Sequence, residues 1–345
     1  MDGYRLQIIL FDLIRERIND SKHWIDEIAE QLNLSKSAVY KKVNATSSLS
    51  LEELSDLLVT YDISFDDLIR PEKTTVTFSS PYMNRRIKSF LDYFNPLKQS
   101  LEFYSRLPNV EVNYATHELP IFYWLTSRDV CYFKLYAFAR TLWELDGYKD
   151  KPFDLSEFSG EQVIMKEARE IAEYFFTMPS TEFWNQNILG NTLNQIKYFA
   201  NSGLFANMDD AIHLCQSLKD IIVHIREMAS EGKKFFAGQE AGESHADFNL
   251  YHNEIAHTNN TILVESDTVQ AVFATYDSPN FIVSQDETLI DHTKEWYDKL
   301  RRHSLPVSND ASKNRLYLFD QILKRISMTQ TELETLKKTG EAFSV

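Results

Sequence analysis

Lysine and small polar residues gather between residues 35 and 44, where they could contact a nucleic acid. From Gln31 through Leu51 the chain has no Asp or Glu, whereas three lysines add positive charge. Lysine ammonium groups bind phosphates, and serine or tyrosine hydroxyls can reach base edges in the major groove. The sequence predicts contact with double-stranded DNA through Ser35, Lys36, Ser37, Tyr40, Lys41, Lys42 and Asn44. In this set the lysines hold phosphates, and Ser37 and Tyr40 contact bases.

Two short helices joined by a tight corner would position these side chains. The segment 24–43 reads WIDEIAEQLNLSKSAVYKKV. Asn33 tolerates the left-handed backbone of a sharp corner, and Ser35 can cap the second helix by accepting a hydrogen bond from a backbone amide. Apolar residues at helical spacing would pack inward while the contact residues face out; the inward set is Ala38, Val39 and Val43. The alternative is a helical hairpin whose lysines only face solvent.

Residues 6–69 resemble the five-helix DNA-binding domain of the Cro/C1-type (XRE-like) repressors. Asn33 stands where that family usually has a turn glycine, and Val43 lies one residue later than the usual buried position. Capping boxes formed by Ser50 with Glu53 and by Ser64 with Asp67 fit the starts of the last two helices. The apolar positions that carry the resemblance are Leu6, Leu10, Leu13, Ile14, Ile28, Ala29, Leu32, Leu34 and Val39. The resemblance implies a sequence-specific DNA-binding domain in about one fifth of the chain.

The charge balance is unusual for a nucleic-acid binder. The chain of 345 residues has a formal net charge of −15. Residues 1–70 hold 8 Lys and Arg against 13 Asp and Glu, which gives −5 and leaves −10 for the rest. Repulsion from phosphates should weaken binding to random DNA. A homodimer that presents two basic patches would offset this repulsion.

The composition indicates a cytoplasmic protein. Hydrophobic residues make up 43% and charged residues 25%, which suits a buried core and a polar surface. No apolar run reaches the length of about 18 residues that a membrane span needs, and the N-terminus lacks the pattern of a signal peptide. Cys131 and Cys215 lie far apart inside helical patterns, which favours buried, reduced thiols.

The sequence predicts a mainly α protein. Residues 1–70 form the helix-turn-helix domain, 71–81 a linker, 82–245 an aromatic-rich helical bundle for dimerisation or sensing, and 246–345 a small α+β region. In this last region, short β-rich runs separated by turn residues predict an antiparallel meander, beginning with the run that contains His252. Two helices follow, the first opened by Ser284 with Glu287.

Many aromatic residues lie at helical spacing in the bundle. They can form the core, or they can line an apolar pocket for a small effector or a face for a protein partner. They are Trp124, Tyr132, Phe133, Tyr136, Phe138, Trp143, Tyr174, Phe175, Phe176, Trp184, Tyr198 and Phe199.

No catalytic or cofactor-binding motif stands out. There is no glycine-rich phosphate loop and no nucleophile elbow. His252 and His257 are five residues apart, unlike the zinc-protease spacing of four, and His245 lies nearby. We therefore expect no enzyme activity, no cofactor and no metal site.

Together these patterns predict a cytoplasmic, dimeric, sequence-specific transcriptional regulator that responds to an unknown small-molecule or protein effector. The alternative function is an interaction adaptor that uses the aromatic bundle, in which the helix-turn-helix fold does not bind DNA. The net charge of −5 in residues 1–70 favours the adaptor, and the acid-free window favours the regulator.

Overall fold

The computed structural model describes residues 3–18, 23–65, 68, 76–80, 86–254, 260–277 and 279–340. The chain divides into two compact units, Met1–Thr77 and Phe78–Val345. Each unit has a hydrophobic core of its own.

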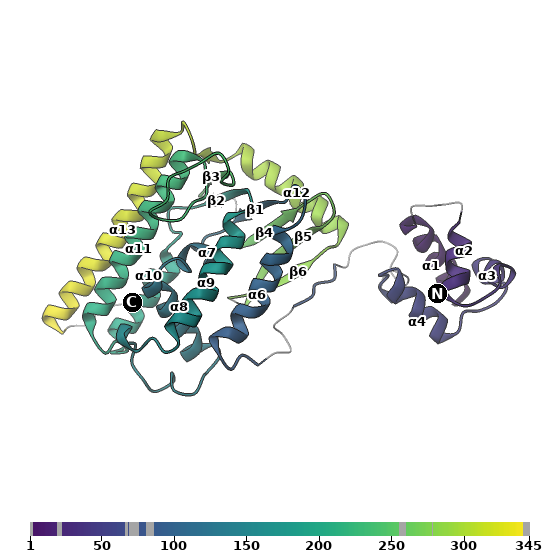
Figure 1. The fold of residues 1–345 in the computed structure, drawn as a ribbon, viewed down its shortest axis with the longest axis horizontal. Coiled ribbons are helices and arrows are strands. Elements are labelled where there is room, and N and C mark those ends of the chain that lie inside the picture. The colour runs from purple at the N-terminus through teal and green to yellow at the C-terminus, as the bar shows by residue number, and fades with distance from the viewer. Residues whose placement is uncertain are drawn as a thin grey trace. The chain divides into compact units, whose positions relative to one another are not determined.

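The first unit is helical (Figure 1). Its helices are α1 (Gly3–Arg17), α2 (Trp24–Gln31), α3 (Lys36–Val43) and α4 (Leu51–Thr60). The predicted capping box starts α4, because the Ser50 hydroxyl accepts from the Glu53 amide while the Glu53 carboxylate accepts from the Ser50 amide. Phe65 and Leu68 are helical, but Asp66 and Asp67 lie outside the described residues, and with them the predicted Ser64–Asp67 box.

The core of the first unit lies between these helices. Its fully buried apolar side chains come from α1, α2, α3 and α4: Leu10, Phe11, Ile14, Ile28, Val39 and Leu57. The amphipathic spacing expected for α1 is therefore present, with Leu6 and Leu13 packed at its margin.

A seven-stranded mixed sheet organises the second unit. The strand order is β6-β5-β4-β1-β2-β3-β7. Strands β1, β2 and β3 are parallel, and every other neighbouring pair is antiparallel. The strands are β1 (Glu111–Ala115), β2 (Ser180–Trp184), β3 (Phe248–His252), β4 (Thr261–Glu265), β5 (Gln270–Asp277), β6 (Asn280–Ser284) and β7 (Leu305–Pro306).

Helices connect the parallel strands, as parallel pairing requires. The segment α7, α8, η1 and α9 joins β1 to β2, and α10 and α11 join β2 to β3. The helical elements of this unit are α6 (Phe90–Ser105), α7 (Ile121–Trp124), α8 (Arg128–Thr141), η1 (Leu155–Glu157), α9 (Glu161–Phe176), α10 (Gly190–Asn201), α11 (Met208–Glu231), α12 (Glu287–Arg302) and α13 (Ser312–Thr339).

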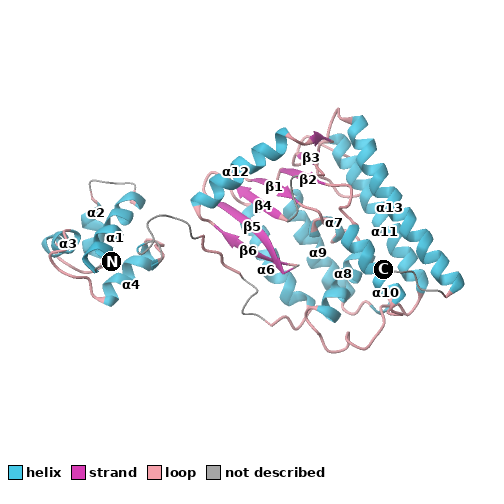
Figure 2. Cartoon of the chain, turned by 180° about the vertical axis from the view of Figure 1, so that it is seen from behind, coloured by secondary structure: helices cyan, strands magenta, loops and turns pink. Residues whose placement is uncertain are grey.

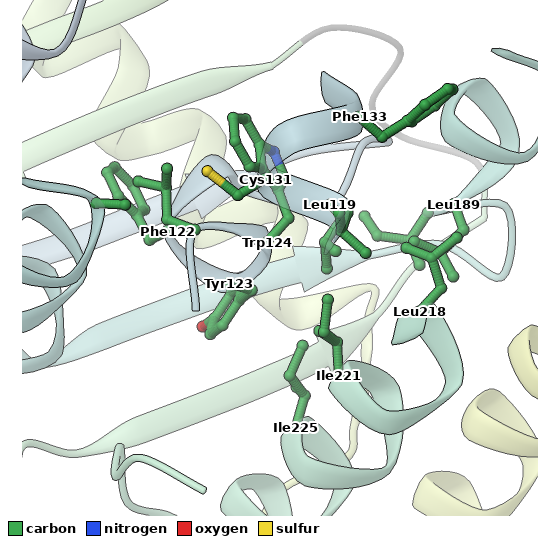
Figure 3. Packing of buried hydrophobic residues seen from close by; sticks show 14 of the residues in the cluster. Leu119, Phe122, Tyr123, Trp124, Cys131, Phe133, Leu189, Leu218, Ile221 and Ile225 are labelled. Atoms are coloured by element: carbon green, nitrogen blue, oxygen red, sulfur yellow. The ribbon is translucent and has the colours of Figure 1, made fainter. Parts of the chain in front are cut away.

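Apolar side chains cover both faces of the sheet. On one face, Val112, Tyr114 and Trp184 belong to the large core formed with the helices from α6 to α11 and α13. On the other face, Ala115 and Phe183 pack with buried residues of α12. Figure 2 shows α12 on the side of the strands opposite to α7, α8 and α9, and Figure 3 shows side chains of α7, α8 and α11 within the large core.

The predicted fold class is wrong for the second unit. A mainly α bundle with a small C-terminal α+β region does not describe it, because β1 and β2 lie in the segment predicted as purely helical and pair with β3 and β4. The single sheet thus joins segments on both sides of residue 245. Strands β1 and β2 have only five residues each. The alternation of polar and apolar residues in β1 (EVNYA) is too short to be distinguished from the helical patterns on both sides, and β2 (STEFW) does not alternate.

The antiparallel meander is present in part. Strands β4, β5 and β6 pair antiparallel in chain order, as predicted. The first predicted meander strand, β3, instead pairs parallel with β2. The predicted start of α12 at Ser284 is also wrong. Asp286 caps this helix, because its carboxylate accepts a hydrogen bond from the Leu289 amide. The Ser284 hydroxyl instead accepts from the amide of Asp286.

Most of the bundle aromatics are core residues. Trp143 and Tyr174 are half-buried and Tyr198 is exposed, whereas the other nine are buried. Both cysteines are free and buried, as expected, and burial raises the pKa of each thiol.

The predicted linker reaches the edge of the sheet. Residues 71–75 and Pro81 lie outside the described residues. Ser79 forms an antiparallel bridge with Val283 on the edge strand β6, with two backbone N–O distances of 2.8 Å.

Candidate nucleic-acid interface

A strained corner sets the angle between α2 and α3. Asn33 has a φ of 51°, the left-handed conformation that the sequence predicted there. The amide of Leu34 donates to the carbonyl of Ala29 at 2.9 Å, which closes the end of α2. Ser35 then caps α3, since its hydroxyl accepts from the Ala38 amide at 3.3 Å.

One side of α3 is open to solvent. Val39 is fully buried and fixes the inner face of the helix. The exposed fraction of Tyr40 is 53%, which leaves its ring and hydroxyl free of the core. The predicted contact residues exposed in this unit are Ser35, Lys36, Ser37, Tyr40, Lys41 and Asn44.

Lys36 is exposed but has a partner on α2. Its ammonium lies 2.5 Å from the Asp26 carboxylate, and both side chains are largely in solvent. The hydrogen bond from Lys36 lowers the pKa of Asp26. Because exposed ion pairs contribute little free energy, a phosphate can replace Asp26 as the partner of this lysine.

Lys42 does not belong to the exposed set, so its predicted role in phosphate contact is wrong. Its exposed fraction is 9%. The ammonium donates to the Ser48 carbonyl at 2.9 Å and to the Glu53 carboxylate at 2.8 Å. Burial acts to raise the pKa of Glu53, but the hydrogen bonds from Lys42 and the Ser50 amide outweigh it, and the pKa lies below its usual value. Lys42 therefore holds the loop after α3 against the start of α4.

Gln7 supports the same loop from α1, a role that the sequence analysis did not predict. Its side-chain amide donates to the carbonyls of Lys42 at 2.5 Å and Ser47 at 2.8 Å. Its side-chain oxygen accepts from the Leu49 amide at 2.9 Å. A polar residue at the spacing of a buried helix face was the signal, because Gln7 precedes Leu10 by three residues and Ile14 by seven.

Lys41 is the exposed cation of α3 without a carboxylate partner. No carboxylate of the described residues lies within 4.0 Å of its ammonium. Its carbonyl accepts from the amides of Thr46 and Ser47, which closes the end of the helix. The exposed stripe of α3 thus carries one free ammonium, one weakly paired ammonium, and hydroxyl and amide groups between them.

Other candidate chemistry is sparse in the described parts of the chain. They contain no group of three or more His, Cys, Asp or Glu that could hold a metal ion. His252 lies 2.6 Å from the Glu254 carboxylate, and His257 lies outside the described residues. Among the described helices none is both long enough and apolar enough to cross a membrane.

Comparison with known proteins finds no matching family model, no similar curated protein and no similar solved structure. The features of the chain that bear on its function are therefore the geometry of α2, α3 and the residues around them.

Proposed function

We propose that this protein is a sequence-specific DNA-binding transcriptional regulator of the Cro/C1 kind. The observation that carries the proposal is the exposed face of α3, which has hydroxyl, amide and ammonium groups and no acidic residue. Helices of this kind enter the major groove, where short polar side chains and tyrosine contact bases. Ser37, Tyr40 and Asn44 take that role in the proposal.

Phosphate contacts come from the remaining exposed residues. Lys41 has a free ammonium, Lys36 can exchange Asp26 for a phosphate, and Ser35 lies at the positive end of the helix dipole. Lys42 contributes to DNA binding only indirectly, because it makes no phosphate contact but fixes the loop that follows α3.

The second unit is proposed to hold two subunits together in a cytoplasmic homodimer and to respond to an effector. A monomer with so few cations and a net charge of −5 in residues 1–70 would bind a single half-site weakly. Pairing two recognition helices raises the effective concentration of the second one at its half-site.

The adaptor alternative loses its main support. It relied on the aromatic bundle as a surface for a protein partner, yet nine of the twelve aromatic residues are buried in the core.

Fluorescence anisotropy with labelled duplex DNA tests the proposal. We expect the full chain to bind with an affinity that falls as salt rises, and Lys36→Glu/Lys41→Glu to abolish binding. Lys219→Glu is a control that makes the same kind of charge change on the exposed side of α11. The proposal would be contradicted if Lys36→Glu/Lys41→Glu bound DNA as tightly as Lys219→Glu, or if the wild type did not bind DNA at low salt.

A further inference from the structure

An apolar cavity lies between helices α6 and α7 and the strands of the second unit. Its volume of about 170 Å³ is close to that of an apolar cavity of about 150 Å³ that holds benzene. Residues lining it on α6 and β6, such as Leu97 and Val283, are half-buried, so the cavity opens toward solvent on that side. The walls include Leu97, Tyr104, Phe122, Val112, Val264 and Phe273.

A smaller polar chamber adjoins the cavity. This chamber has a volume of about 50 Å³ and shares with the cavity the side chains of Tyr93, Tyr114, Ile121, Pro279 and Phe281. Polar residues from five different segments line it: Glu118, Lys134, Thr192, Asn260 and Thr275.

Lys134 brings to this chamber a buried cation that forms no ion pair with the described residues. Its exposed fraction is 5%, and its ammonium donates to the side-chain oxygen of Gln195 at 2.9 Å. The Thr192 hydroxyl lies farther away, at 3.5 Å. No carboxylate oxygen of the described residues lies within 4.0 Å of the ammonium. A buried charge in this state is unfavourable, and an anion at the chamber would relieve it.

Glu118 supplies a negative charge to the same chamber. Its carboxylate accepts a hydrogen bond from the Asn191 side chain. Burial lowers the pKa of Lys134, and the charge of Glu118 opposes that lowering, so the two groups interact although they form no ion pair. The buried hydroxyl of Thr275 has no hydrogen-bond partner among the described residues.

We propose that this cavity binds a compact zwitterion, an α-amino acid with one aromatic ring or a branched alkyl side chain. The Lys134 ammonium pairs with the carboxylate of the ligand, and the Glu118 carboxylate pairs with its ammonium. The apolar side chain fills the larger cavity, and Thr275 gains a hydrogen-bond partner. A simple carboxylic acid would be repelled by Glu118 and a simple amine by Lys134, so neither matches both charges.

The site does not depend on DNA binding by the first unit, so direct titration of the full chain tests it. We expect L-phenylalanine or L-leucine to bind saturably in isothermal titration calorimetry. Glycine lacks the apolar group, 3-phenylpropionate lacks the ammonium, and phenethylamine lacks the carboxylate. Each should bind at least about tenfold more weakly, as expected for the loss of a charged hydrogen bond or of apolar burial. No binding by either amino acid, or binding by 3-phenylpropionate as tight as that of phenylalanine, would overturn the proposal.

A matched pair of variants locates the site. Glu118→Gln should weaken phenylalanine binding about tenfold while binding of 3-phenylpropionate stays the same or tightens, because only phenylalanine has an ammonium for Glu118. Glu111→Gln, at the exposed start of β1, should change neither ligand. Thermal melts show whether both variants are folded. Equal weakening of both ligands by Glu118→Gln, or weakening by Glu111→Gln, would place the site elsewhere.

Discussion

Lys41 and Lys42 are neighbours in the chain, yet α3 turns their ammonium groups into opposite environments. Lys41 faces solvent, whereas Lys42 is buried beside Glu53 and the Ser48 carbonyl. A helix turns by 100° per residue, so Lys42, three residues after the fully buried Val39, lies over the inner face. The same residue type therefore contacts solvent at one position and fixes a loop at the next.

This difference predicts separate effects on stability and on DNA binding. Lys42→Met should lower the free energy of unfolding of the first unit by about 1–3 kcal/mol, because the Ser48 carbonyl and Glu53 lose their buried donor. Lys41→Met should leave stability nearly unchanged and reduce the salt dependence of DNA binding by about one phosphate contact. Thermal melts and salt titrations of both variants measure this, and a larger loss of stability for Lys41→Met would contradict it.

Tyr40 is predicted to distinguish bases and not to support the core. Because about half of the side chain is exposed, Tyr40→Ala should change the melting temperature very little. It should weaken discrimination at one operator position by about 1–3 kcal/mol, the usual range for a base contact. A binding profile over single-base operator variants tests this. Uniform weakening at every position, together with a lower melting temperature, would instead make Tyr40 a structural support of the first unit.

At the residue scale the sequence pattern was informative except where polar residues are buried. The turn at Asn33, the cap at Ser35 and the buried Val39 could all be predicted from local backbone chemistry. Gln7 and Lys42 lie on buried faces because each has partners more than five residues away. Such partners cannot be read from one helix alone.

At the scale of elements, a buried polar cluster joins β2 to its neighbours. Glu182 on β2 accepts from the Tyr123 hydroxyl at 2.5 Å and from the Trp184 indole at 3.0 Å. Lys234, between α11 and β3, donates to the carbonyls of Phe175 and Met178 near the end of α9. Burial raises the pKa of Glu182 and lowers that of Lys234, and the opposite charge of each partner opposes both changes.

Removing the cation of this cluster should destabilise the second unit strongly. Lys234→Met removes the buried donor of the Phe175 and Met178 carbonyls and the positive charge that offsets the burial of Glu182. We expect a loss of at least about 2 kcal/mol in the free energy of unfolding, because two buried carbonyls lose their hydrogen bonds. Lys233→Met is the matched control, because Lys233 is the adjacent residue and pairs with the mostly exposed Asp247. Its expected loss is about 0–1 kcal/mol. Chemical denaturation measures the free energy of unfolding of both variants. Similar losses of this free energy in the two variants would show that the cluster does not stabilise the sheet.

The elements that could be predicted were those with a local pattern. Turn residues separate the strands of the β4–β6 meander, and long helices such as α9 have clear apolar stripes. Strands β1 and β2 have five residues each. The alternation in β1 is too short to be distinguished from the adjoining helical patterns, and β2 does not alternate. Their parallel pairing depends on contacts between segments far apart in the chain.

At the scale of the whole molecule, two units with separate cores divide the proposed tasks. The first unit carries the candidate nucleic-acid interface, and the second carries the sheet and the cavity beside Lys134. We expect a fragment of residues 1–77 to fold on its own, because its described buried apolar residues form a hydrophobic cluster of their own.

The same fragment should bind DNA far more weakly than the full chain. It contains one recognition helix and lacks the second unit, which is proposed to pair subunits. Circular dichroism establishes whether the fragment is folded, and anisotropy on one operator compares the affinities. A folded fragment that binds as tightly as the full chain would contradict the proposed role of the second unit in dimerisation.

The most direct test of the proposed function is selection of binding sites from a random pool of duplex DNA with the full chain. We predict enrichment of one sequence with two inverted half-sites, because two recognition helices related by a two-fold axis read a palindrome. Their centres should be about one helical turn of DNA apart. The Tyr40→Ala protein should recover the same palindrome with one position relaxed in each half. A pool that stays random after repeated rounds with folded wild-type protein would contradict sequence-specific DNA binding.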